Sequence, residues 1–395
     1  MSSRSSGQGS WVRGRSDRFR EMLSGLLSCC LVLLLSDVVV AAEITANKMA
    51  ILNTEQGKVT VFEDGVSIVD GETRIAASRV EFHDAENRAV ISGGVSIVMP
   101  GSQATADSAE YLPGSRKTYL YRNVTVSREG FVISGQSLVL DNALDQVLAE
   151  TDVHVTDAGR GVEIWGGAGV FDLSSEDGTI YGSPRLVLQR ASAMTVTGDE
   201  MRVHRGRREA RTLGHVRVVT GDAVLTCDTL DYFIDEDSAR AQGRPVLKQG
   251  ENTVSGEMMM FHLEEGDLKR INVAGSPKLV QQDGELAGRQ VEIRFDKGKL
   301  AAIEVIGDSA NQPELKQERN KARGDCIAFR FEKGEVQEIS MTGKTRGSYL
   351  TQDNDRVEVE GRESSVRFRD GKPVLMTVAG VTDGKLFHRI GAKKP

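Results

Sequence analysis

The sequence predicts an all-β protein in which one long antiparallel meander folds lengthwise into a V-shaped, jellyroll-like trough. Three observations support this fold class. A motif recurs at nearly constant spacing, apolar and polar residues alternate inside each repeat, and short glycine-containing segments separate the alternating runs. Glycine is frequent, at 42 of 395 residues, and proline is rare, at 8, which favours many tight turns in one continuous domain.

The chain opens with a segment typical of an export signal, so residues 1–42 are set apart from the fold. Arginines precede an apolar stretch over 26–35, and small residues offer a cleavage site before Glu43. Asp37 interrupts the apolar run, which is then too short for the roughly 20 residues that a membrane-spanning helix needs. A retained anchor and lipidation at Cys29 stay open as alternatives to cleavage.

A small residue marks every repeat, within the motif apolar-x-(Gly/Ala)-x-x-apolar-x-(Phe/Tyr/aliphatic). This first anchor falls at Ala77, Ala106, Gly135, Gly166, Gly198, Cys227, Gly256, Gly288, Gly324 and Gly361. A second anchor, usually Gly-x-(Val/Pro), falls at Asp64, Gly93, Arg122, Thr151, Gly182, Gly214, Gly243, Gly275, Gly307, Gly343 and Gly380. Both spacings begin at 29 residues and reach 36 and 37 near the C-terminus. The repeat predicts ten to eleven two-strand units in one continuous domain over 43–390, followed by a tail over 391–395.

Each unit holds two alternating runs, and alternation with period two indicates a half-buried strand. The segments between the runs have the composition of hairpin turns. Tight turns favour antiparallel pairing, whereas the parallel β-helix, which stays open as the alternative fold, needs crossover connections.

The apolar phase changes at the first anchor. An apolar residue precedes the anchor by two positions and the next two follow it by three and five, which strict period two does not allow. We therefore predict a bulge or corner at each small residue, where the backbone bends. Four aspartates directly follow an anchor, and we expect their carboxylates to bond freed backbone amides. They are Asp107, Asp199, Asp228 and Asp325.

Several stretches resemble a known family. Ile44-Thr-Ala-Asn-Lys-Met-Ala, followed by Gly57-Lys-Val-Thr-Val-Phe-Glu-Asp-Gly-Val-Ser-Ile, resembles the start of LptA/OstA-like (organic solvent tolerance-like) domains. The family pairs a small-Asp-x-apolar-x-Tyr/Phe strand with a Gly-x-Val strand, as in Ala106-Asp-Ser-Ala-Glu-Tyr111 and Gly214-His-Val216. The resemblance covers essentially the whole chain after the leader and weakens after about Gly307.

This resemblance implies a non-enzymatic periplasmic bridge that shields the acyl chains of lipopolysaccharide, or of a related glycolipid, on the way to the outer membrane. It also implies partners, namely an inner-membrane LptC-like and an outer-membrane LptD-like protein joined by edge-strand pairing, and head-to-tail self-association. The chain is longer than one small bridge module, so whether it spans the periplasm alone stays open.

Apolar side chains on the inner faces are the candidate lipid-binding residues. A Val/Ile/Leu-lined trough suits acyl chains, because burying each methylene contributes about 0.8 kcal/mol without directional bonds. The repeat alone leaves both a lipid groove and a filled core open, and the resemblance favours the groove. The alternatives are an exported β-solenoid scaffold or adhesin with a filled core, and a polysaccharide-active β-helix enzyme. The predicted groove residues are Ile75, Val80, Phe82, Val95, Ile97, Val124, Val126, Ile133, Leu138, Leu140, Val153, Val155, Ile164, Leu186, Val196, Met201, Val203, Val216, Val218, Leu225, Leu230, Met259, Val291 and Ile293.

An open meander leaves two edges with unpaired backbone groups, which invite strand addition. We expect one edge near Ile44 to Thr60 and the other near Val374 to His388, with Val59 and Val61 of the first strand as docking residues. Charged residues near the C-terminus instead offer a way to blunt the other edge.

The remaining chemistry points away from catalysis and cofactors. Six histidines lack metal-site spacing, and the two cysteines beyond the leader, Cys227 and Cys326, are too far apart in the predicted meander for a disulfide. The formal charge is −7, and after the leader no basic cluster occurs except in the last few residues, which argues against nucleic acid as a partner. The sequence therefore predicts no catalytic residues, no metal and no cofactor.

Overall fold

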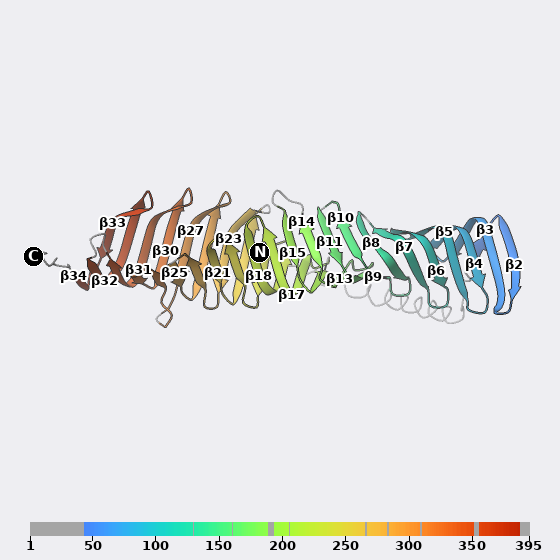
Figure 1. Cartoon of the computed structure of the whole chain (residues 1–395), viewed down its shortest axis with the longest axis horizontal. Helices are drawn as coiled ribbons and strands as arrows, with labels where there is room; N and C mark the ends of the chain where they lie inside the picture. The colour runs from blue at the N-terminus through green and yellow to red at the C-terminus, as the bar shows by residue number, and fades with distance from the viewer. Residues whose placement is uncertain are drawn as a thin grey trace, which may run out of the picture.

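The computed structural model describes residues 43–387, except 129, 160, 189–192, 205, 265–266, 283, 309 and 351–354. The predicted signal peptide over 1–42 and the tail over 391–395 lie outside the described residues. Within them, 34 strands form one continuous sheet in an elongated body, with the earliest strands at one end and the last at the other (Figure 1). No helix long and apolar enough to cross a membrane occurs in this part of the chain.

The sheet is folded along its length into two walls that meet at a corner. Wall A is the half that contains β2 (Lys48–Thr54), and wall B is the half that contains β1 (Glu43–Thr45); both strands pair with β3 (Gly57–Asp70), on either side of its corner. Neighbouring strands pair antiparallel throughout both walls. The predicted antiparallel fold is therefore confirmed, and the parallel β-helix is excluded.

The strands fall into three groups by the wall or walls that they cross. Those that run through both walls are β3, β4 (Thr73–His83), β5 (Arg88–Met99), β6 (Ser102–Leu112), β7 (Lys117–Arg128), β8 (Phe131–Asp141), β17 (Glu209–Thr220), β18 (Ala223–Phe233), β31 (Glu335–Leu350) and β32 (Arg356–Arg369). Wall A also contains β2, β9 (Gln146–Thr151), β12 (Ala168–Asp172), β13 (Gly178–Tyr181), β16 (Glu200–His204), β19 (Ser238–Gln242), β22 (Met258–Glu264), β23 (Asp267–Ala274), β26 (Gln290–Asp296), β27 (Lys299–Ile306), β30 (Cys326–Glu332) and β33 (Lys372–Ala379). Wall B also contains β1, β10 (Val153–Asp157), β11 (Val162–Gly166), β14 (Arg185–Leu188), β15 (Met194–Thr197), β20 (Val246–Gln249), β21 (Asn252–Ser255), β24 (Lys278–Gln281), β25 (Gly284–Ala287), β28 (Glu314–Gln317), β29 (Asn320–Arg323) and β34 (Asp383–Phe387).

The corner lies where the two anchors meet on paired strands. The β3/β4 ladder slips between Glu63 and Val66, and similar register shifts interrupt the β5/β6 and β7/β8 ladders. At the second anchor the backbone is left-handed, with φ of 82° at Gly93 and 70° at Gly214, a conformation that glycine adopts without strain. The predicted bend is therefore confirmed.

The first anchor is small for a different reason than the one predicted. Its glycines do not have positive φ; instead the corner leaves them no room. A Cβ added at Gly256 would lie 2.6 Å from Cγ1 of Val273, on the facing strand. Close approach of the backbone to the inner side chains, and not a left-handed conformation, selects the small residue here.

The relative lengths of the strands in the two walls change along the molecule. In the N-terminal region, residues 57–181, strands such as β6 and β7 divide about equally between the walls. In the C-terminal region, residues 238–342, the wall-B strands β20, β21, β24 and β25 have 4 residues each, whereas β22, β23, β26 and β27 in wall A have 7 or 8. Wall A therefore extends beyond wall B in the C-terminal region.

Candidate lipid-binding interior

The space between the walls is apolar along the body. One cluster of buried side chains runs from Val66 to Met341 without a break at any unit boundary. All the predicted groove residues except Val203 belong to this cluster or pack against it. Val203 is half-buried in β16 and lies outside the cluster. The sequence pattern thus identified the inner face correctly, and the structure brings these side chains together in one interior.

In the N-terminal region this interior is closed as far as the mouth, by which we mean the open side of the V opposite the corner. Leu120 and Leu138 are 0% exposed, and Leu140 and Val147, in the row nearest the mouth, are 1% and 0% exposed. The protein's own side chains fill the region, so an acyl chain enters it only if the walls move apart.

In the C-terminal region the row nearest the corner is equally buried, with Val291 and Val305 at 0% exposure, but the mouth differs. The part of wall A that extends beyond wall B presents a strip of half-buried apolar side chains, here called the mouth strip. Its members are Phe261, Leu268, Phe295, Leu300, Phe329 and Ile339. None of these was among the residues predicted for the groove. Part of the lengthening of the anchor spacing toward the C-terminus was the signal for them, because wall A gains residues there.

Three contacts bridge the mouth of the N-terminal region. The Tyr111 hydroxyl, from wall A, donates to the Asp70 carboxylate at the tip of wall B. The Arg128 guanidinium, from wall B, donates to the Leu173 carbonyl at the tip of wall A. Beside it, the rings of Phe131 and Phe171 meet edge-on across the mouth, with centroids 6.4 Å apart. None of these bridges was predicted, because the strand pattern does not reveal which residues face one another across the V.

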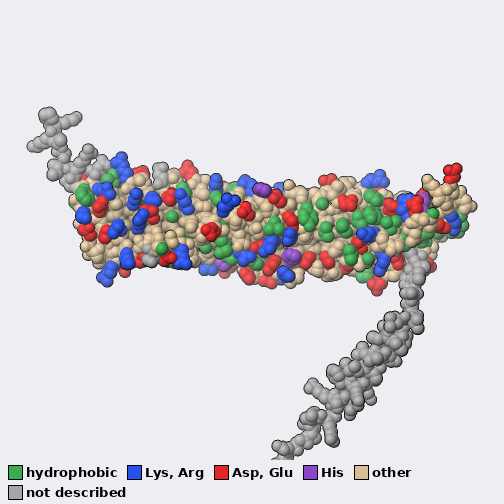
Figure 2. Space-filling model, turned by 90° about the horizontal axis from the view of Figure 1, so that it is seen from below, with side chains coloured by type: hydrophobic (Ala, Val, Ile, Leu, Met, Phe, Trp, Pro, Cys, Tyr) green, Lys and Arg blue, Asp and Glu red, His purple; other side chains and the backbone are tan. Residues whose placement is uncertain are grey.

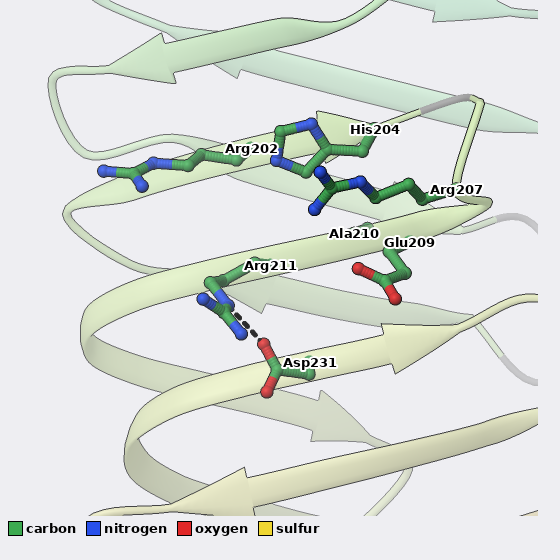
Figure 3. Close-up of a pocket in the computed structure, with 7 residues that line it drawn as sticks. All are labelled: Arg202, His204, Arg207, Glu209, Ala210, Arg211 and Asp231. Atoms are coloured by element: carbon green, nitrogen blue, oxygen red, sulfur yellow. Dashed lines mark hydrogen bonds and ion pairs between the residues drawn. The ribbon is translucent and has the colours of Figure 1, made fainter.

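The outer faces carry ion pairs between neighbouring strands. In wall A, Asp231 accepts from Arg211 and, at 2.8 Å, from Nη2 of Arg240. Asp231 and Arg211 line a polar pocket together with Arg202 and His204 (Figure 3). Burial alone would raise the pKa of the Asp231 carboxyl, yet the hydrogen bonds and charges of the two arginines outweigh it and lower that pKa. Charges of both signs are interspersed over the face seen in Figure 2. Pairing between neighbouring strands stabilises the sheet.

Asp107 and Asp199, two of the aspartates that follow a first anchor, bond side chains at the corner instead of the expected backbone amides. Asp199 bonds Nδ1 of His215 at 2.8 Å, and Asp107 accepts from Nδ2 of Asn123 at 3.0 Å. Both partners occupy the position just after the second anchor, which is why each carboxylate meets a side chain on the paired strand. The bonds hold the corner together.

The N-terminal edge lies within the predicted stretch 44–60, but not at the two residues predicted to dock a partner. Val59 and Val61 lie in β3, where they pair with Leu52 and Ala50 of β2 on one side and with His83 and Glu81 of β4 on the other. Their strand is thus interior to the sheet, and the prediction of these two residues as edge residues is wrong. The edge strand of wall A is β2, and its apolar side chains are strongly exposed. They are Met49, Ile51 and Leu52.

The described residues contain no group of three or more histidine, cysteine, aspartate or glutamate side chains placed to hold a metal ion. Cys227 and Cys326 are both free thiols. Burial, followed by the charge of Asp228, raises the pKa of Cys227 to about 11, so this thiol stays protonated and unreactive near neutral pH. It acts as a small apolar side chain at the corner.

Comparison with known proteins bears on the N-terminal part of the chain. Residues 43–145 match the model of a family described as LptA/(LptD N-terminal domain) LPS transport protein. The predicted family resemblance is confirmed over these residues. None of the curated proteins matches the chain in sequence.

Among solved structures, the crystal structure of LptH from Pseudomonas aeruginosa is similar to part of the chain. It is described as the LptA homologous periplasmic component of the conserved lipopolysaccharide transport device. The identity is 19%, the match covers 27% of this chain and 79% of LptH, and the TM-score is 0.24.

The local structure of the family-matched residues continues beyond them. The β3/β4 ladder slips at the corner between Glu63 and Val66, and the β31/β32 ladder slips in the same way between Thr342 and Thr345. The left-handed residue inside the slip also recurs, as Asp64 with φ of 63° in β3 and Gly343 with φ of 72° in β31. The two-walled architecture is therefore one structure from end to end.

Proposed function

We propose that this chain is an exported, non-enzymatic carrier that shields the acyl chains of lipopolysaccharide, or of a related glycolipid, between its walls during transport to the outer membrane. One observation carries the proposal: the apolar interior is unbroken from Val66 to Met341 and begins within residues that match a lipopolysaccharide transport family. The signal-like segment over 1–42 supports the periplasm as its location.

The interior suits a ligand that slides. Each methylene that leaves water contributes about 0.8 kcal/mol without directional bonding, so an acyl chain meets no single deep minimum along a Val/Ile/Leu-lined surface. The mouth strip is the most accessible part of this surface, because Phe295 and Leu300 are half-buried where wall B is short. We expect acyl chains to contact it first, with the glycolipid head group remaining in water.

The ends of the body support docking by strand addition. At one end β2 presents an edge with exposed Met49 and Ile51, and at the other β33 and β34 present exposed Leu375 and Phe387. An edge strand with apolar side chains pairs readily with another chain. We assign the two ends to an LptC-like inner-membrane partner and an LptD-like outer-membrane partner. Head-to-tail pairing of two copies uses the same edges.

The test is photo-crosslinking in cells with a crosslinking amino acid at neighbouring positions. Phe295 belongs to the mouth strip, and Arg294, the preceding residue, is exposed on the outer face. We expect lipopolysaccharide adducts at position 295 and none at position 294. Mass spectrometry of the excised adduct identifies the lipid.

Equal adducts at positions 294 and 295, or none at position 295, would contradict the carrier function. The closed N-terminal region is the observation that favours the second candidate, a scaffold or adhesin with a filled core. That candidate requires exposure on the cell surface and no lipid on the purified protein.

A further inference from the structure

Two inward-pointing polar side chains lie at the mouth of the N-terminal region, where the repeat usually places apolar ones. Ala104, Ala106 and Ala109 precede Tyr111 along the inner face of β6, and Val124 and Val126 precede Arg128 along that of β7. Both side chains reach the opposite wall, Tyr111 to Asp70 and Arg128 to Leu173.

The Tyr111 contact is buried. The ring is 2% exposed, although its hydroxyl meets a carboxylate at the rim. Burial, and after it the bond to Asp70, raises the pKa of this hydroxyl, which therefore remains a donor at physiological pH. A hydrogen bond to an ionised carboxylate is about twice as strong as one between neutral groups.

Breaking the Arg128 contact would leave a charged guanidinium at the mouth without this hydrogen bond, which costs free energy. Its Nε is buried without a hydrogen-bond partner, while an Nη1 proton goes to the Leu173 carbonyl. The Phe131 and Phe171 rings close the mouth next to it. A guanidinium held inside an apolar mouth stays there only while it has such a partner, so this contact depends on the walls being together.

Tyr232 occupies the same repeat position as Tyr111, but its hydroxyl has a different hydrogen-bond acceptor. It follows its anchor, Cys227, by five residues, as Tyr111 follows Ala106, and it too lies at the end of a wall-A strand. Its hydroxyl donates to Asp237, 3.1 Å away, at the tip of its own wall. The tyrosine hydroxyl at this repeat position therefore bonds across the mouth in one unit and within its own wall in another.

We propose that the contacts of Tyr111 with Asp70 and of Arg128 with Leu173 form a latch that holds the two walls of the N-terminal region together. The region has no space for a ligand while it is shut, since the inner rows are almost fully buried. Opening the latch is thus the step that admits an acyl chain, a consequence that rests on the proposed carrier function. The latch itself is a property of the lipid-free protein.

Hydrogen–deuterium exchange of the lipid-free full chain tests the latch. Tyr111→Phe removes the donor and keeps the ring, and Arg128→Met removes the guanidinium and keeps most of the length. We expect amide exchange in peptides covering residues 66–70 and 108–112 to accelerate on the order of tenfold in Tyr111→Phe, the effect of losing one hydrogen bond to a charged group. Arg128→Met should accelerate peptides covering 124–128 and 168–173.

Matched controls are Tyr232→Phe, at the same repeat position, and Arg217→Met, on the exposed outer face of wall B. Both should leave these peptides at the wild-type rate. If the Tyr111 and Arg128 variants exchange like the controls, the latch does not exist.

Measuring lipid uptake distinguishes failure of the latch from failure of the proposed carrier function. After incubation with lipopolysaccharide micelles, native mass spectrometry should show faster loading of the two latch variants than of wild type. A protein that loads no lipid in any form overturns the carrier function, while the exchange result still decides the latch. Should wild type load lipid and the loosened variants load it no faster, the latch does not control entry and that part of the proposal is wrong.

Discussion

The N-terminal and C-terminal regions are built from the same repeat, yet their mouths differ. In the N-terminal region the walls are about equal in length and side chains bridge them, so Leu140 at the mouth is almost fully buried. In the C-terminal region wall A extends beyond wall B, and the apolar row that this extension adds, with Leu300, stays half-buried. Lengthening one strand pair per unit is thus enough to change a closed core into an accessible apolar strip.

The largest expected effect compares these two leucines directly. Leu140→Ala removes a fully packed side chain and should lower the free energy of unfolding by about 3 kcal/mol, the usual loss when a core leucine is truncated. Leu300→Ala removes one that is already partly in water, and about 1 kcal/mol is expected. Urea unfolding followed by circular dichroism measures both. Equal losses would show that the two mouths are packed alike and that the C-terminal mouth is not the more accessible one.

A second prediction concerns the corner, where the two regions should behave alike. Gly256→Val, in the C-terminal region, and Gly135→Val, in the N-terminal region, each place a branched side chain in a tight space. An added Cβ would lie 2.6 Å from Cγ1 of Val273 at Gly256 and 3.0 Å from Cδ1 of Leu138, on the same strand, at Gly135. We expect each to lose about 2 kcal/mol of stability, against less than about 0.5 kcal/mol for an exposed change such as Lys248→Thr. Thermal melts at one scan rate are sufficient. A stable Gly256→Val with an unstable Gly135→Val would mean that the corner loosens toward the C-terminus.

The sequence contained enough information for the corner and the inner face, but not for the mouth. Ala77 and Gly256 share a local motif, and alternation of apolar residues identifies the inner face of each strand because successive side chains point to opposite sides. The bridge from Tyr111 to Asp70 joins residues 41 positions apart, and no local pattern distinguishes Tyr111 from Tyr232. Contacts across the V depend on how far each wall extends, which only the assembled sheet determines.

The docking residues of the N-terminal edge were misplaced for a related reason. Residues 49–52 are apolar without alternation and therefore do not predict a strand, whereas the alternating run that includes Val59 and Val61 does. In the structure, β2 is exposed on both faces, so neither alternation nor burial was needed for it to form. Pairing with β3 supplies its hydrogen bonds instead.

A third prediction uses pH to probe the strand-to-strand ion pairs between the regions. The folded pKa of Asp231 is lowered, so its pairing with Arg211 and Arg240 adds stability above the carboxyl's unfolded pKa of about 3.9 and loses it as the pH falls through the folded value. Asp231→Asn should therefore cost about 1 kcal/mol at pH 7, and the gap to wild type should close below about pH 4. Asp235→Asn, on the exposed turn that follows, is the control. A gap that is constant with pH would mean that the carboxylate's charge is not what stabilises the sheet.

The smallest effect on stability, and the sharpest test of function, is expected at the ends. Ile51 is 52% exposed on β2, so Ile51→Lys should change the free energy of unfolding by less than about 0.5 kcal/mol. A lysine on an edge strand discourages pairing with another chain, so the same variant should weaken association with the partner at that end. Phe387→Lys is the matched change on β34 at the other end.

If each end docks a different partner, copurification from detergent extracts should lose the inner-membrane partner with one variant and the outer-membrane partner with the other. Loss of both partners with either variant would instead mean that docking at one end depends on the other, and unchanged copurification with both would exclude the edges as docking sites.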